Sequence, residues 1–251
     1  MKISIITVVF NNYNTIAESI ESVLSQSYPD IEYIIIDGKS TDGTLDVIKG
    51  YGDNIDLVVS ERDDGLWDAM NKGANLAKGE YVGFLNADDF LAHKDVIYNI
   101  ATTIDENNRA DALYGYLDIV DEKNTAKVVR HYRVKWYTKS ALRLGLMCAH
   151  PTFYCKRELF EKYGGFSLSD EITPDFELMV RFYQTPGFRS VCLPQVLVKM
   201  RNGGLGNSSL SYKLARLKKQ ANSCRMNGIY STPWMILLKY PYKLLEYTKI
   251  L

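Results

Sequence analysis

Acidic and amide side chains follow three apolar runs of this 251-residue chain, at points where β-strands are expected to end. The runs end at Asn11, at Asp37 and at the pair Asp88-Asp89. In open α/β sheets the ligand crevice lies at the carboxyl ends of the strands, so we expect these side chains on one rim. The sequence has neither GxGxxG nor GxxxxGK[ST], so phosphates bound there would need another source of positive charge. A divalent cation held by Asp88 and Asp89 would supply it, because Mg²⁺ combines one or two carboxylates with substrate phosphates.

A purely structural role is the alternative for each candidate residue. The Asp88-Asp89 pair could be a solvated turn or a helix cap, and Asp37 followed by Gly38 could be only a turn. Asp175 follows Pro174 and could be a first-turn acid that the helix dipole stabilises.

The order of the apolar runs predicts a mostly parallel sheet covered by helices. Four strands and three helices are expected in the first 90 residues: strands Ile3–Val9, Ile31–Ile36, Ile55–Val59 and Tyr81–Leu85, and helices from a Thr15/Glu18 capping box, over Thr44–Lys49 and over Leu66–Ala77. The later elements expected are a hairpin of Leu113–Val120 and Lys127–Val134, a helix over Pro174–Tyr183, short strands over Phe188–Leu193 and Val196–Met200, and a basic helix over Ser209–Met226.

The composition excludes some classes of protein. Hydrophobic residues make up 46% and charged residues 24%, which excludes a disordered or fibrous chain. The 30 Lys+Arg balance 30 Asp+Glu, so we expect no nucleic-acid partner. The balance is uneven along the chain, since residues 199–251 hold ten basic groups and one acid.

The cysteines and the apolar runs predict a cytoplasmic protein. The four cysteines lack the spacing of a metal site, and the sequence has no signal peptide and no apolar run of about 20 residues.

Five segments in one order resemble the family 2 glycosyltransferases over about residues 1 to 205. The segments are Ser4–Asn11, Ile34–Thr44 with its Asp-Gly-Lys-Ser-Thr-Asp-Gly-Thr sequence, Glu61–Gly73, Phe84–Asp89, and Gly164-Gly165-Phe166 followed by Asp175–Arg181. The third segment is similar to the branch that builds bacterial surface polysaccharides. The chain departs from the family pattern at Val8, where a proline is usual, at Asn86, the first member of the Asp-x-Asp motif, and at Pro174, the first member of an acidic pair.

The resemblance implies the GT-A fold, which binds nucleotide sugars, and it implies roles for single residues. Asp89 would hold Mn²⁺ or Mg²⁺, and Asp88 would contact the ribose or the metal shell. Asp37 would accept a hydrogen bond from the base, and Val8 and Phe10 would line the nucleoside pocket. The remaining nucleotide-sugar contacts implied are Asn11, Asp63, Asn71 and Asn86.

The resemblance also implies a reaction. It is the transfer of a single sugar from a nucleotide diphosphate sugar, with inversion, to a saccharide or lipid-linked saccharide during surface polysaccharide synthesis. A UDP-sugar is the favoured donor. Asp175 would be the general base, with Glu177 as the second candidate. His150 would contact the acceptor or a phosphate, or would be a satisfied core histidine. A non-catalytic nucleotide-sugar binding module of the same fold is the alternative function.

The basic C-terminal segment, 206–251, is expected to be a helical extension of a GT-A domain spanning 1–205. Its Lys, Arg, Trp and Tyr residues suit an anionic membrane surface at the cytoplasmic leaflet. A packing helix pair with a solvated face, or a contact in a homo-oligomer, is the alternative.

Overall fold

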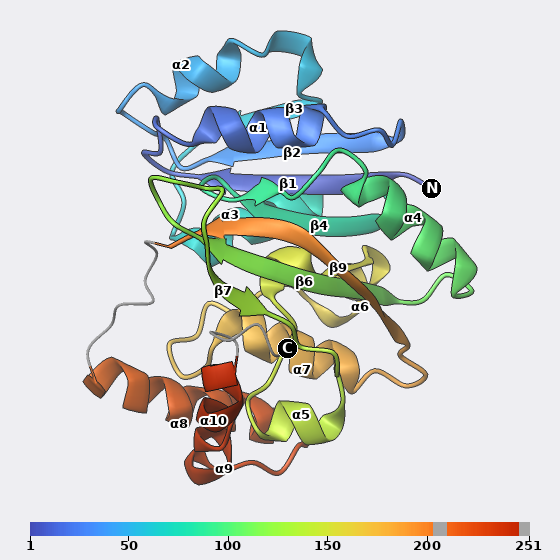
Figure 1. Ribbon diagram of the computed structural model, residues 1–251, viewed down its shortest axis with the longest axis vertical. Coiled ribbons are helices and arrows are strands. Elements are labelled where there is room, and N and C mark those ends of the chain that lie inside the picture. The colour runs from blue at the N-terminus through green and yellow to red at the C-terminus, as the bar shows by residue number, and fades with distance from the viewer. Residues whose placement is uncertain (203–209, 246–251) are drawn as a thin grey trace.

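A central sheet runs through the computed structural model (Figure 1). The backbone is described for residues 1–202 and 210–245, and the side chains are described for residues 1–202 and 214–243. The sheet within these residues has nine strands: β1 (Ile3–Val9), β2 (Ile31–Asp37), β3 (Leu57–Ser60), β4 (Tyr81–Asn86), β5 (Phe90–Leu91), β6 (Ala112–Val120), β7 (Val128–Tyr132), β8 (Tyr154–Lys156) and β9 (Ser190–Arg201). The helices are α1 (Ile16–Leu24), α2 (Thr44–Lys49), α3 (Leu66–Leu76), α4 (Val96–Glu106), α5 (Lys139–Arg143), α6 (Glu158–Tyr163), α7 (Pro174–Tyr183), α8 (Leu210–Met226), α9 (Pro233–Leu237) and α10 (Lys239–Leu245), with short 3-10 turns at Gly52–Asn54 and His150–Thr152.

The strand order is β3-β2-β1-β4-β8-β6-β9-β5, with β7 paired to β6. Strands β1 to β4 are mutually parallel, and β6 and β9 form a second parallel pair, so most paired residues lie in parallel ladders. The prediction of a mostly parallel α/β sheet is confirmed. The antiparallel strand β8 joins the two parallel parts by pairing with β4 and β6, while β5 and β7 add antiparallel pairs to β9 and β6. The register pairs Val9 with Asp37 and Val8 with Asn86, which brings the ends of β1, β2 and β4 to one edge.

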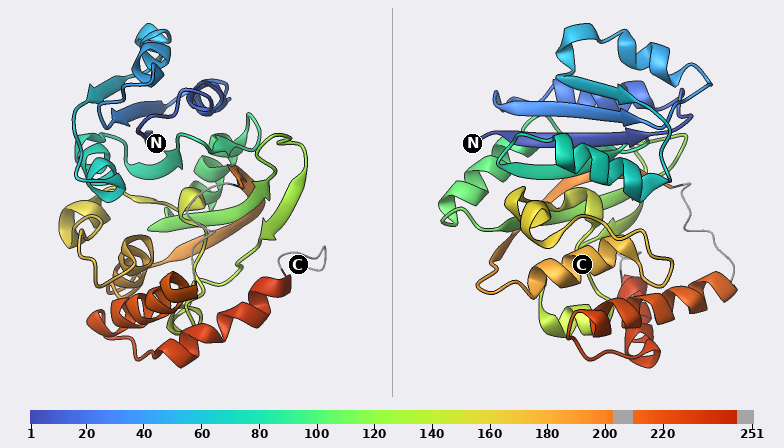
Figure 2. Two further views of the ribbon diagram at one scale, coloured as in Figure 1. Left: turned by 90° about the vertical axis from the view of Figure 1, so that its left-hand side faces the viewer. Right: turned by 180° about the vertical axis from the view of Figure 1, so that it is seen from behind.

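Helices cover both faces of the sheet (Figure 2). Alternate residues of β1 point to opposite faces: Ile5 packs with α1, α2 and α4, whereas Ile6 packs with α3, α6 and α7. Both faces are apolar, which explains why β1 and β2 are continuous runs of buried residues rather than alternating ones.

Three local predictions were wrong in detail. The third strand begins at Leu57 and not at Ile55, because it pairs with β2 only from Ile34 onward. The two short strands expected between 188 and 200 are one strand, β9, whose register shifts near Tyr116 where Pro194 interrupts the pattern. The third error is the predicted capping box at the start of α1. Thr15 caps no backbone N–H with its side chain, and its hydroxyl instead donates to Asn12 and to the carbonyl of Ala87.

The C-terminal segment is helical in its described residues. The apolar stretch from Pro233 forms two short helices, α9 and α10, and α8 packs against α5 and α7. Along the described residues, no helix has the length and apolar character needed to cross a membrane. The proposed domain boundary at 205/206 and the residues after 245 lie outside the described residues.

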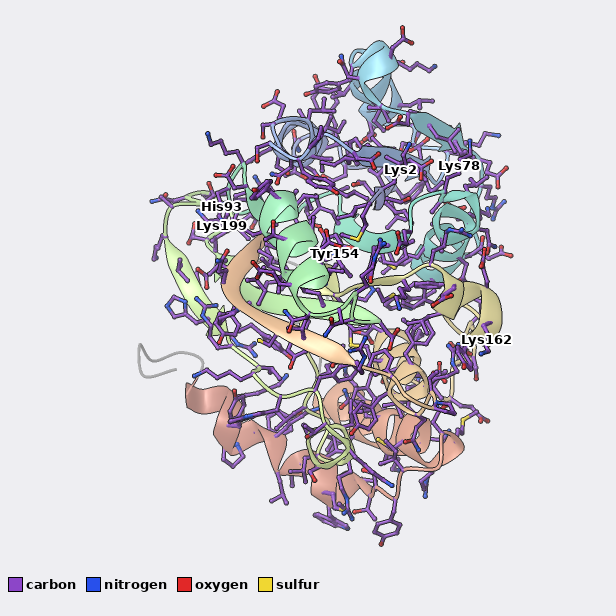
Figure 3. The ribbon with its side chains drawn as sticks, turned by 90° about the vertical axis from the view of Figure 1, so that its right-hand side faces the viewer. Lys2, Lys78, His93, Tyr154, Lys162 and Lys199 are labelled. Carbon is purple, nitrogen blue, oxygen red and sulfur yellow. The ribbon has the colours of Figure 1, made fainter. Side chains whose placement is uncertain are left out.

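The packing of β4 against β8 gives a stability prediction. A Cβ added at Gly83 would lie 2.2 Å from the ring of Tyr154, which is fully buried beneath α4 and is labelled in Figure 3. Because the ring has no room to move, we expect Gly83→Ala to lower the free energy of unfolding by about 1–3 kcal/mol. Urea unfolding measures this. Glu106→Ala, an exposed change at the end of α4, is the control and should stay within about 0.5 kcal/mol of wild type. Equal urea midpoints for the two variants would show that the Tyr154 ring has room to move away from the added methyl group.

Candidate functional site

A cavity of about 700 Å³ opens at the carboxyl ends of β1 and β2, beside the start of α3. Its apolar walls come from Val8, Val9, Phe10, Leu66 and Ala69. Its polar lining comes from Lys39, Thr41, Arg62 and Asp63. The volume is in the range of small-ligand sites, and apolar walls with a few charged groups are their usual lining. Val8, Phe10 and Asp63 were predicted to contact a nucleotide sugar, and the structure brings them together here.

Two other predicted contact residues hold the loop that closes this cavity. The carboxylate of Asp37 is fully buried, accepts a bond from the Ser40 N–H at 3.2 Å and another from the Ser60 hydroxyl at 2.6 Å. Asn11 accepts a bond from the Thr41 N–H at 2.8 Å, and its own N–H donates to Ser40. Their polar atoms are thus engaged with the 38–41 loop. Direct contact of either side chain with a base stays a prediction.

Asp63 is fixed from the opposite wall. Its Oδ1 lies 2.6 Å from the Lys72 ammonium, and Glu61 and Asp68 lie within 2.9 and 3.3 Å of the same group. The hydrogen bond that Lys72 donates to Asp63, followed by the one to Glu61, raises the pKa of Lys72 above its ordinary value. Lys72 therefore ties the loop after β3 to helix α3 and so sets the shape of the cavity wall.

The end of β4 carries a buried carboxyl group with incomplete hydrogen bonding. Asp89 is fully buried; its Oδ2 accepts a bond from the Asn86 amide at 2.9 Å, while its Oδ1 has no partner. Burial chiefly, and then the charge of Asp88, raises the pKa of Asp89 well above its ordinary value. Buried polar atoms are nearly always paired, so the free oxygen marks a place suited to a donor or a cation.

Arg201 holds this strand end in place from the end of β9. Its guanidinium donates to the backbone carbonyl of Asp88 at 2.6 Å and pairs with Glu18 of α1. It also lies over the ring of Phe90, 5.2 Å from the ring centroid. Three segments far apart in sequence are thereby locked around Asp88 and Asp89.

His150 lies in a cage of aromatic rings next to the same edge. Its ring stacks on Phe84 of β4 at 5.6 Å between centroids, and meets the edges of Phe166 at 5.4 Å and of Trp67 at 6.1 Å. Burial lowers the pKa of His150, and the neighbouring charge of Asp175 opposes that shift. His150 is therefore a neutral imidazole beside a carboxylate at ordinary pH.

Asp175 stands in the first turn of α7 and is half-buried. One carboxylate oxygen accepts a bond from the N–H of Phe176 at 2.8 Å. Its charge acts on His150 and on the buried ammonium of Lys239. Asp175 and His150 thus form one electrostatic group, which α7 and the 150–152 turn bring together.

The structure does not bring Glu177 to this group. Its carboxylate pairs with Arg181 at 2.9 Å and accepts a bond from the Asn227 amide at 2.9 Å. Arg181 in turn donates to the carbonyls of Gly164 and Gly165. One oxygen of Glu177 is thus paired within α7 and the other also binds Asn227, while a role for Glu177 as a second base or ligand contact stays a prediction.

Asn71 also binds protein rather than open space. Its amide donates to the Phe166 carbonyl at 2.8 Å and accepts from the Phe166 N–H at 2.7 Å. Phe166 is one wall of the cage around His150. These bonds let Asn71 position Phe166, while its contact with a nucleotide sugar stays a prediction.

Sequence reasoning missed Arg62, Lys39 and Leu66 in the cavity and gave Arg201 no role at the site. The first three lie close in sequence to residues that had been singled out: Arg62 and Leu66 near Asp63, and Lys39 next to Gly38. That nearness could have indicated that they line the cavity. Nothing near Arg201 in sequence indicates its contact with Asp88, which is 113 residues away.

The donor set near Asp88 and Asp89 fits a divalent cation only with help from a ligand. Within residues 1–202 and 214–243, no group of three or more His, Cys, Asp or Glu side chains is placed to hold a metal. Two carboxyl groups, one with an unpartnered oxygen, match the way Mg²⁺ is bound when substrate phosphates and water supply the other ligands.

Comparison with known proteins adds sequence relatives. The family model described as "Glycosyl transferase family 2" matches residues 4–164. A PGL/p-HBAD biosynthesis glycosyltransferase of Mycobacterium tuberculosis is 27% identical over 230 residues, which are 89% of this chain and 85% of the relative. An uncharacterized glycosyltransferase of Rickettsia typhi is 31% identical over 189 residues, 72% of this chain and 58% of the relative.

Solved structures show the fold. S. aureus TarS 1-349 in complex with UDP-GlcNAc superposes with a TM-score of 0.70 at 19% identity, over 90% of this chain and 65% of that one. The mannosyltransferase PcManGT from Pyrobaculum calidifontis, in complex with GDP-Man and Mn²⁺, gives 0.65 at 21% identity, over 98% of this chain and 70% of that one. The predicted GT-A fold is confirmed by these likenesses.

The positioning role of Asn71 gives a prediction. In Asn71→Ala the buried N–H and C=O of Phe166 both lose their partner, so we expect a loss of about 2 kcal/mol in the free energy of unfolding. Chemical denaturation with far-UV circular dichroism measures it. Asn99→Ala, which removes a single exposed bond to Gln195, serves as control. A loss in nucleotide affinity with unchanged stability would instead favour direct contact by Asn71.

The buried ammonium of Lys239 gives a prediction of pH dependence. Lys239 is 4% exposed and donates to the Gln220 side chain, and burial, with repulsion from Lys243 and Arg216, lowers its pKa to about 7 from 10.5. Between these two values the unfolded chain binds a proton that the folded chain does not, so the stability contributed by this residue rises with pH.

Replacing Lys239 by methionine should remove that dependence. We expect Lys239→Met to gain stability relative to wild type at pH 7, and to lose most of that relative gain by about pH 10. Urea unfolding at the two pH values measures it, with Lys218→Met on the exposed side of α8 as the matched control. The same stability difference at both pH values would mean that Lys239 keeps its ordinary pKa.

Proposed function

The chain belongs to glycosyl transferase family 2 and is a glycosyltransferase, and on that premise we propose that it moves a single sugar from a nucleotide diphosphate sugar to a saccharide or lipid-linked saccharide, with inversion, in surface polysaccharide synthesis. The observation that carries the proposal is the position of the cavity. It opens at the same sheet edge as the unpartnered carboxyl oxygen of Asp89, since Val8 of the cavity pairs with Asn86 in the register of β1 and β4.

The cavity suits the nucleoside part of the donor. Phe10 and Leu66 offer apolar surface to a planar base, and Lys39 and Arg62 offer positive charge toward a ribose or diphosphate. The neighbour structures hold UDP-GlcNAc and GDP-Man, which supports a nucleotide sugar here. We favour a UDP-sugar, as the sequence pattern around Asp37 indicates for the family.

Asp88 and Asp89 would hold the divalent cation, Mn²⁺ or Mg²⁺, with the diphosphate as the remaining ligand. When bound, such a cation neutralises the negative charge that develops on the leaving diphosphate. Asn86 and Arg201 orient the two carboxyl groups, because one bonds the side chain of Asp89 and the other the backbone of Asp88.

Asp175 would remove the proton from the attacking acceptor hydroxyl. It is half-buried in the first turn of α7, and its Oδ1 accepts a bond from the N–H of the next residue. Neutral His150 can donate one ring N–H, and its aromatic cage fixes the direction of that bond. We therefore assign His150 to positioning Asp175 or the acceptor hydroxyl.

A sequence relative supports the proposed class of acceptor, and the sequence supports a single addition. The mycobacterial relative is named for PGL/p-HBAD biosynthesis, which supports a role in glycan assembly on a carrier. A single addition for each acceptor is proposed because the chain lacks the Gln-x-x-Arg-Trp sequence of processive synthases.

The test is nucleotide release from a panel of nucleotide diphosphate sugars with cation and a mixture of acceptors. For the preferred donor we expect Asp175→Asn to lower kcat by 10²-fold or more, roughly the contribution of a general base, with nucleotide affinity unchanged. Asp170→Asn, an exposed acid in the loop before α7, is the matched control and should keep wild-type kcat.

Two outcomes would contradict the proposal. Full transfer by Asp175→Asn would remove this residue from the reaction. Tight nucleotide-sugar binding without turnover for any acceptor would favour the non-catalytic binding module.

A further inference from the structure

The three C-terminal helices form one end of the molecule, opposite α2 (Figures 1 and 2). Helix α8 packs against α5 and α7, and α9 packs against α8. The end surface is therefore built on the side of the molecule that holds Asp175, at the start of α7.

Large apolar side chains project from this end surface. Trp234 is 79% exposed and Leu238 is 62% exposed, and Leu237 lies next to them on the same short helical stretch. Met226 and Tyr230, just before α9, are also exposed. Single exposed apolar residues are ordinary, but several within one segment of 13 residues form a patch of the kind that binds a partner or a membrane.

The fold holds these side chains outward. Ile236 is fully buried against Leu217 and Ala221 of α8, and the Thr232 hydroxyl caps α9 by accepting a bond from the Met235 N–H at 3.3 Å. Lys239 points inward to Gln220. With these anchors on the inner side, Trp234 and Leu238 are held on the outer side of a rigid turn.

The C-terminal segment brings only positive charge to the patch. Residues 202–245 contain no Asp or Glu, and Arg216, Lys218 and Arg225 of α8 are exposed. Arg143 of α5 lies over the Tyr230 ring, 5.8 Å from its centroid. The exposed acid Glu171 lies beside α8, where its carbonyl accepts a bond from Asn222, so the basic groups outnumber the acid there.

We propose that this end surface docks on an anionic lipid bilayer, with α9 lying in the headgroup region. Trp and Leu side chains on an amphipathic surface enter that region, and Lys and Arg beside them are attracted to anionic lipids. A two-fold contact between copies of this chain would place the same basic surface against itself, which like-charge repulsion opposes. Charge complementarity therefore selects the anionic membrane over a second copy.

Docking at this end would help the proposed reaction, although the docking itself does not depend on that reaction. Helix α7, which carries Asp175 in its first turn, packs against α8 of this end surface, so docking would bring the bilayer close to the element that carries the base. Delivery of a lipid-linked acceptor is the part that rests on the proposed function; binding to lipid is independent of it.

The experiment is flotation of the full chain with vesicles of phosphatidylcholine, alone or mixed with phosphatidylglycerol, at low and high salt. We expect binding to the mixed vesicles at low salt, weaker binding at high salt, and little binding to phosphatidylcholine alone. Trp234→Ser with Leu238→Ser should weaken partitioning roughly tenfold, and so should Arg216→Gln with Lys218→Gln. Tyr98→Ser with Lys94→Gln, an exposed aromatic and cation near α4, is the matched control.

Three results would overturn the proposal. Wild type could fail to float with anionic vesicles at low salt, or the Trp234/Leu238 variant could float as well as wild type. Sedimentation could also show a dimer that this variant abolishes without any vesicle binding, which would make the surface a self-association face. Sugar transfer to a water-soluble acceptor should be unchanged in the variant, so that failed docking and failed catalysis are told apart.

Discussion

The buried carboxyl group of Asp89 is the feature on which the rest of this site depends. Removing a carboxylate from water costs several kcal/mol unless it is paired, and only one of its two oxygens has a partner. The surroundings nevertheless hold it in place, since Asn86 bonds its side chain and Arg201 ties the adjacent backbone to α1. A carboxyl group that is costly to bury, and whose pKa is raised near the sheet edge where a cavity opens, is typical of a functional site.

Much of the remaining polar structure serves to hold loops around that edge. Asp37 and Asn11 fix the 38–41 loop, Lys72 fixes the loop after β3, and the Asn71 amide fixes Phe166. Each tie joins a loop to a strand or helix of the rigid scaffold, which is how functional loops are held in position. The cavity and the aromatic cage of His150 are therefore preformed, and the chemistry is placed by side chains that need not touch the ligand themselves.

The sequence predicted those parts of the fold that depend on local pattern. The continuous apolar runs of β1, β2 and β4 and the polar residues at their ends were enough to place the sheet edge, and Val8, Phe10 and Asp63 were found in the cavity wall. Long-range pairing could not be predicted in this way. Glu18 was expected to cap its own helix but pairs with Arg201, 183 residues away, and Glu177 accepts a bond from Asn227, 50 residues away. A charged residue has several partners within reach of the chain, and only the three-dimensional packing selects one.

The most direct test of the central role of Asp89 is the melting temperature with UDP and Mn²⁺, added singly and together, for wild type and for Asp89→Asn. A ligand that binds the folded state raises the melting temperature by mass action. We predict that the melting temperature of wild type rises only when UDP and Mn²⁺ are added together. Without ligands, Asp89→Asn should melt at or above wild type, because the buried charge is gone. With both ligands present, the melting temperature of Asp89→Asn should not rise. An equal joint rise in the variant would contradict the account, because Asp89 would then be a structural acid and not a ligand for the cation and nucleotide.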